Sequence, residues 1–466
     1  MGSFEIDHTE EDLNRDETAR ATGFIGKGSE ISWLHKLGGE VDCDRDPAIA
    51  SCVSSPGPNS PSNGHGDSCI ALSNYYLDDL DLPCVNHLDA YEVPTREAAG
   101  RLFNAYLSSV HPSFPIIGVS TFASQFQAFF SQPTLKPGRK WLAILNLIFA
   151  IGARFVYLTD SSLHQHGKEH MTYFSRAKVL SLDDQFLQHP DLQQLQVEGL
   201  ASFYLLVLGH MNRYYILFLP LPSCPSLVVV LPSLLVLFTL TVLYRSWKLI
   251  GSAVRGALSL GLHLRNEGPC TSDVSKEIRY RVWWSLYTVE HLLTVMTGRP
   301  SCIADNFCTT PLPVPFDESD FQKEEVARLI SSPRRGSIQS QLDGFAVPPP
   351  GTPGPDASDP DASFVSHGSN KDVGIGSSEY LKGLTPCMSL YFIRLASLTA
   401  ISKRVMVKLY SPEAALLPSP TIEFTIQSLM LGIDSWLINL PAAYDFTSTQ
   451  TSQCPASQNE PRLVLL

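Results

Sequence analysis

The stretch that most constrains the fold is Arg245–Leu264, RSWKLIGSAVRGALSLGLHL, in which apolar and small residues recur at intervals of three and four. This spacing places one apolar stripe along one side of a helix, while Lys248 and Arg255 fall on other faces. A glycine inside a helix costs roughly 1 kcal/mol relative to alanine, and tight packing against neighbouring helices can offset that cost. The stretch therefore predicts a thin helix at the centre of an all-α core. The stripe consists of Trp247, Ile250, Gly251, Val254, Leu258 and Gly261.

Helical patterns continue on both sides of this stretch. Thr95 is a suitable N-cap for the first of them, because its hydroxyl can accept a hydrogen bond from the first turn. No alternating strand pattern of useful length lies between the helical segments, which favours a multi-helix bundle. The further helices are predicted over residues 96–110, 120–130, 140–158, 170–180, 192–213, 274–296, 380–409 and 421–437.

Composition distinguishes the helical domain from two segments that we expect to be disordered, one before the domain and one within it. Residues 1–92 hold 18 acidic and 5 basic residues, which predicts an acidic, mostly disordered arm over residues 1–93. Residues 318–378 are rich in proline, glycine and serine, and we expect a disordered linker there. The helical domain would then occupy residues 94–317 and continue over 379–440. No basic patch supports direct contact with phosphates.

The pattern from Trp247 to His263, Trp-x-x-Ile-Gly-x-Ala-x-Arg-x-Ala-x-x-x-Gly-Leu-His, resembles the regulatory domain of fungal transcription factors. That domain is the all-helical middle region of binuclear zinc-cluster activators, and it is often called the xylanolytic activator domain. Matches in the same order and spacing include His111-Pro-Ser-Phe-Pro-Ile, Arg279-Tyr-Arg-Val-Trp-Trp and Thr297-Gly-Arg-Pro-Ser. The resemblance spans roughly residues 23–440. It implies a nuclear regulator of RNA polymerase II transcription, with DNA and zinc binding implied by the family alone.

Two regions depart from this resemblance. The family's helical region normally continues past a segment similar to Trp436-Leu-Ile-Asn-Leu-Pro, so residues 441–466 are interpreted as a truncated tail. The run at residues 214–244 carries no charged residue and has the length of a transmembrane segment, but four prolines interrupt it. Without it, and with only one of Arg213 and Arg245 kept, His210-Met-Asn-Arg leads directly into Ser246-Trp-Lys-Leu-Ile-Gly, as in the family. We interpret 214–244 as a translated intron or an aberrant apolar insertion.

The sequence gives no sign of metal binding or catalysis. The family's zinc cluster needs six cysteines with two Cys-x-x-Cys pairs, and the ten cysteines here form no such pair. Cys302 and Cys308 are interpreted as ordinary thiols. The run from His166 to His170 matches the H-x-x-E-H pattern of inverted zinc peptidases, but no carboxylate follows Glu198 until Glu267, so a solvated helix start is preferred. We therefore expect neither an enzyme nor a cofactor in this chain.

A small-molecule effector site is the remaining candidate. Gly298-Arg299-Pro300 follows a tryptophan-rich helix, and it either lines an effector pocket or ends the helix with Arg299 bonded to carbonyls. The neighbouring aromatic residues are either core or pocket walls. In the linker, Ser337 follows Arg334-Arg-Gly and suits a basophilic kinase. The candidate pocket residues are Trp247, Arg255, Trp283, Trp284, Tyr287 and Arg299.

Three functions remain open at this level. The first is a nuclear transcription regulator whose helical core restrains or relays activation, with a metabolite as one input. The second is a truncated helical interaction protein that forms a homodimer, or pairs with a zinc-cluster paralogue, and modulates full-length partners without binding DNA. The third is a regulator anchored in a membrane by residues 214–244, which the prolines of that run disfavour.

Overall fold

The computed structural model describes residues 88–132, 136–159, 169–183, 189–218, 225–332, 381, 383–411, 413–441 and 444. Within them, only the backbone enters the description for 158–159, 210–218, 225–241 and 415. The predicted acidic arm as far as residue 87, the linker over 333–380 including Ser337, and most of the predicted tail lie outside the described residues.

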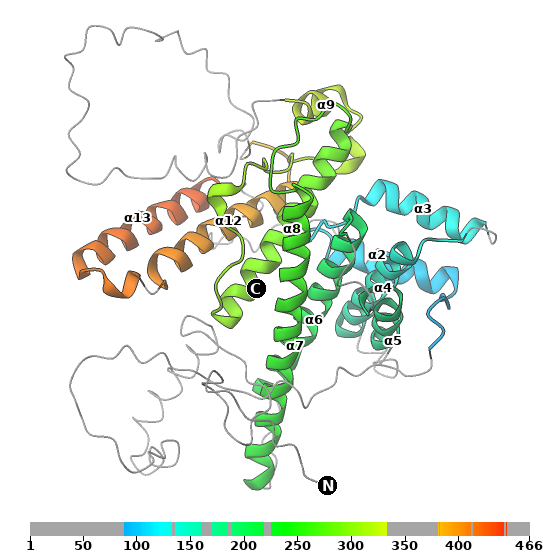
Figure 1. Ribbon diagram of the computed structural model, residues 1–466, viewed down its shortest axis with the longest axis horizontal. Coiled ribbons are helices and arrows are strands. Elements are labelled where there is room, and N and C mark those ends of the chain that lie inside the picture. Colours follow the sequence, from blue (N-terminus) through cyan, green and yellow to red (C-terminus); the bar gives the residue numbers. More distant parts are fainter. Residues whose placement is uncertain are drawn as a thin grey trace, which may run out of the picture.

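The described part of the chain is helical and contains no β-strand, which confirms the predicted all-α fold (Figure 1). The helices predicted from periodicity form, and most of their ends shift by a few residues. The α-helices are α2 (Arg96–Ser109), α3 (Val119–Ser131), α4 (Arg139–Thr159), α5 (Glu169–Ala177), α6 (Leu192–Phe218), α7 (Pro225–Ser259), α8 (Asp273–Thr297), α9 (Glu324–Ile330), α12 (Met388–Leu409) and α13 (Ser419–Ile438). Two starts differ more, because α12 begins at Met388 instead of residue 380 and α7 begins at Pro225 instead of residue 245. A π-helical turn, Lys178–Leu182, extends α5.

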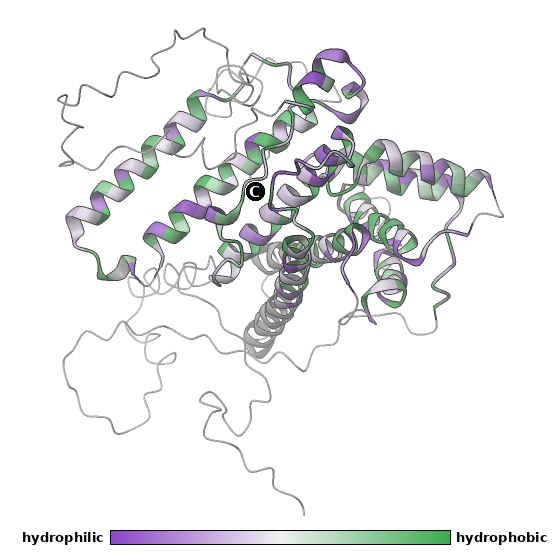
Figure 2. Ribbon diagram, turned by 45° about the horizontal axis from the view of Figure 1, so that its top comes forward, coloured by the Kyte–Doolittle hydropathy of each residue, from purple (hydrophilic) through white to green (hydrophobic). Residues whose placement is uncertain are grey.

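The bundle has α7 and α8 at its centre, with α2–α5 on one side and the α12–α13 pair on the other (Figure 1). Along α7, Ile250 and Val254 of the predicted stripe are fully buried, and so are Ala253 and Ala257, which lie outside it. The other four stripe residues are half-buried. One continuous core joins residues from both sides, including Trp283 of α8 and Phe392 of α12. The segments before and after the linker therefore close into one body. Figure 2 shows the apolar residues of these helices alternating with polar ones along their length.

The central helix ends earlier than predicted. Its pattern predicts a helix to Leu264, but α7 ends at Ser259 and Gly261 adopts a left-handed φ of 70°. The amide of Leu262 donates to the carbonyl of Ala257 at 3.0 Å, and that of Gly261 donates to Leu258 at 3.1 Å. These two bonds define a Schellman cap, which requires a residue without a Cβ at the left-handed position. Gly261 is thus a helix stop and not a packing residue.

Close helix approach through glycine occurs at one glycine of the central helix, Gly256, and at two glycines of other helices. A Cβ on Gly256 would lie 2.6 Å from Leu195 Cδ2, whereas one on Gly251 would meet only Arg255 at 3.7 Å. The tightest approach is elsewhere: a Cβ on Gly152 would lie 2.3 Å from the carbonyl oxygen of Leu102, and one on Gly199 would lie 2.4 Å from Ile116. Glycine therefore lets α4 contact the α2 backbone directly.

The ordered structure extends beyond the predicted start of the linker. Residues 318–332, assigned to the linker from their composition, contain a 3-10 turn and α9. They form a small second core from Val314, Phe321, Val326 and Ile330. The three of these apolar residues that lie within residues 318–378 contribute little to the average composition of that segment, which is rich in proline and serine. For this reason composition alone assigned them to the linker.

The apolar run at 214–244 falls on the end of α6 and the first half of α7. The last residues of the run, Val242 and Leu243, are buried in the bundle core. By length and composition, one helix among the described residues, Arg139–Tyr157 within α4, could cross a membrane, and 72% of that window is buried inside the bundle.

Candidate functional site

The polar centre of the bundle is a connecting segment, residues 311–318, which we call the strap. One face of α8 holds it. Trp284 Nε1 donates to the carbonyl of Pro311 at 2.9 Å, and Arg281 Nη2 donates to the carbonyls of Val314 and Phe316 at 3.4 and 2.6 Å. Glu277 accepts from the amide of Val314 at 2.8 Å. The spacing of Glu277, Arg281 and Trp284 places all three on one side of a helix.

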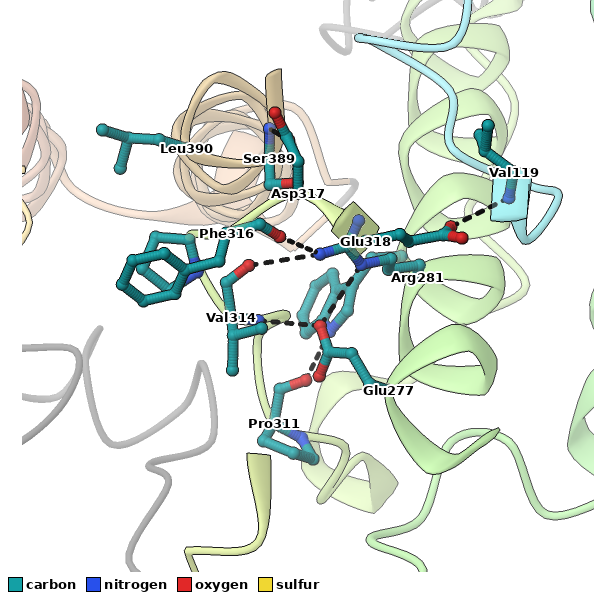
Figure 3. Close-up of polar contacts among 12 residues, drawn as sticks. Val119, Glu277, Arg281, Pro311, Val314, Phe316, Asp317, Glu318, Ser389 and Leu390 are labelled. Carbon is teal, nitrogen blue, oxygen red and sulfur yellow. Dashed lines mark hydrogen bonds and ion pairs between the residues drawn. The ribbon is translucent and has the colours of Figure 1, made fainter. Parts of the chain in front are cut away.

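The end of the strap binds two further helices through adjacent carboxylates. Glu318 accepts from the backbone amides of Val119 and Ser120, at 3.0 and 2.9 Å, and so caps α3, whose own N-cap Gly118 has no side chain to do so. Asp317 accepts from the amide and hydroxyl of Ser389 in the first turn of α12, at 3.1 and 2.7 Å. Figure 3 shows both carboxylates reaching away from α8 toward these helices. Negative charge at a helix N-terminus is favourable because amide donors there lack intrahelical partners.

The charges that hold the strap are buried. Arg281 and Glu277 are 4% and 0% exposed, and Arg281 Nε lies 3.3 Å from Glu277 Oε1. The guanidinium also lies over the ring of Phe321, 5.0 Å from its centre. Removing two charges from water is costly unless hydrogen bonds satisfy them, and here the strap carbonyls and amide supply those bonds. The strap and α8 are therefore mutually dependent.

A cavity of about 410 Å³ lies between α2, α3, α8, α12 and the strap, and we call it the strap cavity. Its walls are mostly apolar, and its polar lining includes His111, Arg281 and Asp317. Burial, and secondarily the charge of Arg281, lowers the pKa of His111 to about 3, so this imidazole is neutral at ordinary pH. The Nδ1 atom of His111 is buried and has no hydrogen-bond partner. The apolar wall includes Leu107, Pro112, Pro115, Val119, Pro313, Met388 and Phe392.

The residues predicted to form an effector pocket lie in different surroundings, and only Arg255 lines one of the two cavities described in this section. Trp283, Trp284 and Tyr287 are at most 1% exposed and lie inside the core. The guanidinium of Arg299 stacks over Trp247, 4.5 Å from its ring centre. None of these five lines the strap cavity or the second cavity described below. The turn interpretation of this segment has support, because Gly298 is left-handed and its amide donates to Thr294 at 2.8 Å.

A second cavity, of about 620 Å³, lies between α5, α6 and α7. Its lining contains the remaining predicted pocket residue, Arg255, together with the cations Lys178, Arg245 and Lys248 and the acids Asp183 and Glu198. Burial raises the pKa of Glu198, and hydrogen bonds from Gln194 and Ser252 oppose that shift. Lys248 and Arg255 are exposed, whereas Lys178 and Arg245 are half-buried, and Lys178 Nζ lies 3.9 Å from Asp183 Oδ1.

The sequence patterns with metal-like spacing form no metal site within the part of the chain that the structure describes. Across residues 88–332 and 381–444, as far as these are described, no group of three or more His, Cys, Asp or Glu side chains is arranged to hold a metal ion. His170 is buried and its Nδ1 lies 2.7 Å from the Tyr204 hydroxyl, while His166 lies outside the described residues. Burial raises the thiol pKa of Cys302 to about 12 and that of Cys308 to about 11, so both thiols stay protonated at neutral pH.

Sequence reasoning missed the strap and its cavity. Glu277 and Arg281 sit four residues apart in a helix otherwise crowded with large apolar residues, and that pairing was the available signal. Asp317 and Glu318 could not be assigned from sequence, because Ser389 is 72 residues from Asp317 and Val119 is 199 residues from Glu318.

The fold and this site define a helical regulatory bundle with an enclosed polar segment. A match to the fungal specific transcription factor domain covers residues 103–437, and the chain belongs to that family. It is 32% identical over 476 aligned residues to a transcription regulator, galc, of Aspergillus niger, a match that covers 99% of this chain and 50% of that protein. It is 23% identical over 270 residues to the positive regulator of purine utilization of Emericella nidulans, covering 50% of this chain and 24% of that protein.

A shorter match, 39% identical over 107 residues, is to the negative regulator of pleiotropic drug resistance STB5 of Candida glabrata, and it covers 22% of this chain and 11% of that protein. The chain thus spans half or less of the length of these relatives. No solved structure matches it. The family and its named members assign this chain a role in transcription regulation.

Proposed function

We propose that this chain is the regulatory core of a nuclear fungal transcription regulator and that it acts by changing the contacts of its helices, without catalysis and without a bound cofactor. The observation that carries the proposal is the strap. Residues 311–318 join α3, α8 and α12 through directional hydrogen bonds, so a change at one of these helices alters the anchoring of the other two.

This mechanism needs an element with two discrete arrangements. Glu318 and Asp317 each accept hydrogen bonds from the first turn of a helix. If either carboxylate moved away, the backbone amides of that turn would have to donate to water instead. The bundle can therefore hold α3 and α12 in a fixed relation or let one of them move. In the proposal, contact with DNA and with partner proteins, including a second copy of the chain or a zinc-cluster relative, is governed by this choice.

The proposal is tested by tethering the full chain to a reporter promoter through a heterologous DNA-binding domain in a fungal host. We expect Glu318→Ala to change reporter output severalfold, because it removes the cap of α3. The matched control is Glu324→Ala, which removes an acidic residue that is 79% exposed and pairs only along α9 with Arg328. Equal output from the wild-type chain and both variants, at equal protein level, would contradict the proposal.

The alternative functions give different results in the same cells. An interaction protein that titrates partners would alter the output of full-length relatives while the tethered chain itself stays silent. A membrane-anchored regulator would sediment with membranes and resist carbonate extraction.

A further inference from the structure

The strap cavity has the size and lining of a ligand site that lies next to the proposed switch. Its volume of about 410 Å³ falls within the range of small-molecule pockets, and its wall is mostly apolar, with polar groups contributed by the strap and by the surrounding helices. An apolar cavity lined in this way favours a ligand with an apolar body, because burying that body removes its surface from water.

Two buried polar side chains at this cavity retain hydrogen-bonding capacity. Arg281 uses Nε for Glu277 and Nη2 for the strap carbonyls, while its Nη1 makes no hydrogen bond with the described residues. His111 is 9% exposed, and its buried Nδ1 atom has no hydrogen-bond partner in the described part of the chain. A buried polar group without a partner is costly, and a ligand that supplies the partner recovers that cost.

The charges around the cavity argue against an ionised ligand. Arg281 is already paired with Glu277, so it offers no excess positive charge to an anion. Asp317 and Glu318 add negative charge to the lining. His111 is neutral because its pKa is lowered to about 3. An anion would therefore lose its hydration without gaining a free counter-ion.

We propose that the strap cavity binds a small, uncharged molecule with an apolar body and hydroxyl or carbonyl groups on one edge, which face Arg281 and His111. The inference rests on the proposed regulatory function and names the ligand class of its switch. A bound molecule contacts α2, α12 and the strap together, since Leu107, Phe392 and Asp317 all line the cavity. A bound ligand would therefore stabilise the arrangement in which the strap holds α3 and α12 in a fixed relation.

The test uses the purified full chain and matched pairs of probes with the same carbon skeleton. Benzyl alcohol is compared with benzoate, and cyclohexylmethanol with cyclohexanecarboxylate, by isothermal titration calorimetry. We expect saturable millimolar binding of the alcohols and at least about tenfold weaker binding of the carboxylates. A saturating alcohol should also slow amide hydrogen exchange at Val119 and Ser389, the strap's two anchoring sites.

Two variants on α2 localise the binding. Ser108 lines the cavity and is exposed, so Ser108→Phe covers the mouth without entering the core. Ser109, its exposed neighbour, does not line the cavity, and Ser109→Phe is the control. We expect Ser108→Phe to weaken alcohol binding about tenfold and Ser109→Phe to leave it unchanged.

The proposal is overturned if the carboxylates bind as well as the alcohols, if neither alcohol binds, or if both α2 variants behave alike. These outcomes are separate from a failure of the proposed function. Equal reporter output from the wild-type chain and Glu318→Ala, with alcohol binding retained, would reject the regulatory role and leave the ligand site standing.

Discussion

The side of the bundle built from α4, α6 and α7 is held together differently from the side built from α8, the strap and α12. On the first side, helices approach closely through glycine, as at Gly152 and Gly256, and most of the buried residues are apolar, although Asn146 and Gln194 are buried there too. The buried hydroxyls of Ser202 and Ser246 pair with each other across α6 and α7 at 3.0 Å. On the second side, a buried ion pair and two capping carboxylates make the connections.

The difference teaches where this domain can change shape. Close apolar packing is non-directional, and the stabilisation that it provides decreases steadily when helices move apart. A polar network has discrete bonded arrangements, and it is costly when only partly satisfied. The first side therefore acts as a rigid support, and the second side is where a ligand or partner can select between states.

The largest expected effect comes from breaking the buried pair on the polar side. Glu277→Ala leaves Arg281 buried without its counter-ion and frees the amide of Val314, so we expect a loss of about 3–5 kcal/mol in the free energy of unfolding. The double variant Glu277→Leu with Arg281→Met should lose less, because no uncompensated charge remains. Urea unfolding measures both. A loss below about 1 kcal/mol for Glu277→Ala would show that the pair does not hold the strap.

On the apolar side, Gly152→Ala is the corresponding test. The added Cβ would lie 2.3 Å from the backbone oxygen of Leu102, so α2 and α4 must separate, and we expect a loss of about 1–3 kcal/mol. The control is Gly100→Ala in α2, where nothing lies within 4 Å of the new Cβ. It should stabilise the protein by up to about 1 kcal/mol through helix propensity. Similar thermal shifts in both variants would contradict the close approach of these helices.

Acidification should weaken the polar side. Burial, together with the charge of Lys403, lowers the pKa of His291 from 6.5 to about 4. Between these values the unfolded chain binds a proton that the folded chain does not, so stability is full above pH 6.5 and falls as the pH drops toward 4. His291→Gln removes this proton uptake and should flatten the pH dependence by at most about 1.4 kcal/mol per pH unit. Urea midpoints at a series of pH values measure it, and parallel curves for the two proteins would count against the assignment.

The smallest effect is expected from deleting residues 214–244, which we interpret as a translated intron or an aberrant apolar insertion. Ser202 and Ser246 pair across α6 and α7, and both lie outside residues 214–244, so this contact between the two helices does not need the deleted residues. The deletion also removes Val242 and Leu243, and Met211 and Asn212 must take their places. We expect the remaining helices to form, as judged by circular dichroism, and spliced transcripts to lack these codons. Loss of helix beyond the deleted residues would contradict the interpretation.

The same difference explains what could be predicted from sequence. The helices, the Thr95 cap and the central place of α7 follow from local periodicity, and Thr95 does accept from the amide of Ala98 at 3.4 Å. The strap could not be predicted, because Glu318 and Val119 are distant in sequence and their bond has no local pattern. The candidate pocket around Trp284 was assigned from residue type, whereas the core buries that side chain and directs its N–H to Pro311.

The most direct measurement of the central claim is amide hydrogen exchange across the whole chain, comparing wild type with Glu277→Ala under conditions where both are folded. If the strap joins three helices, protection should fall together in residues 311–318, in the first turn of α3 and in the first turn of α12, while α6 and the buried half of α7 keep theirs. Loss of protection confined to residues 311–318, or spread evenly over the bundle, would contradict the account.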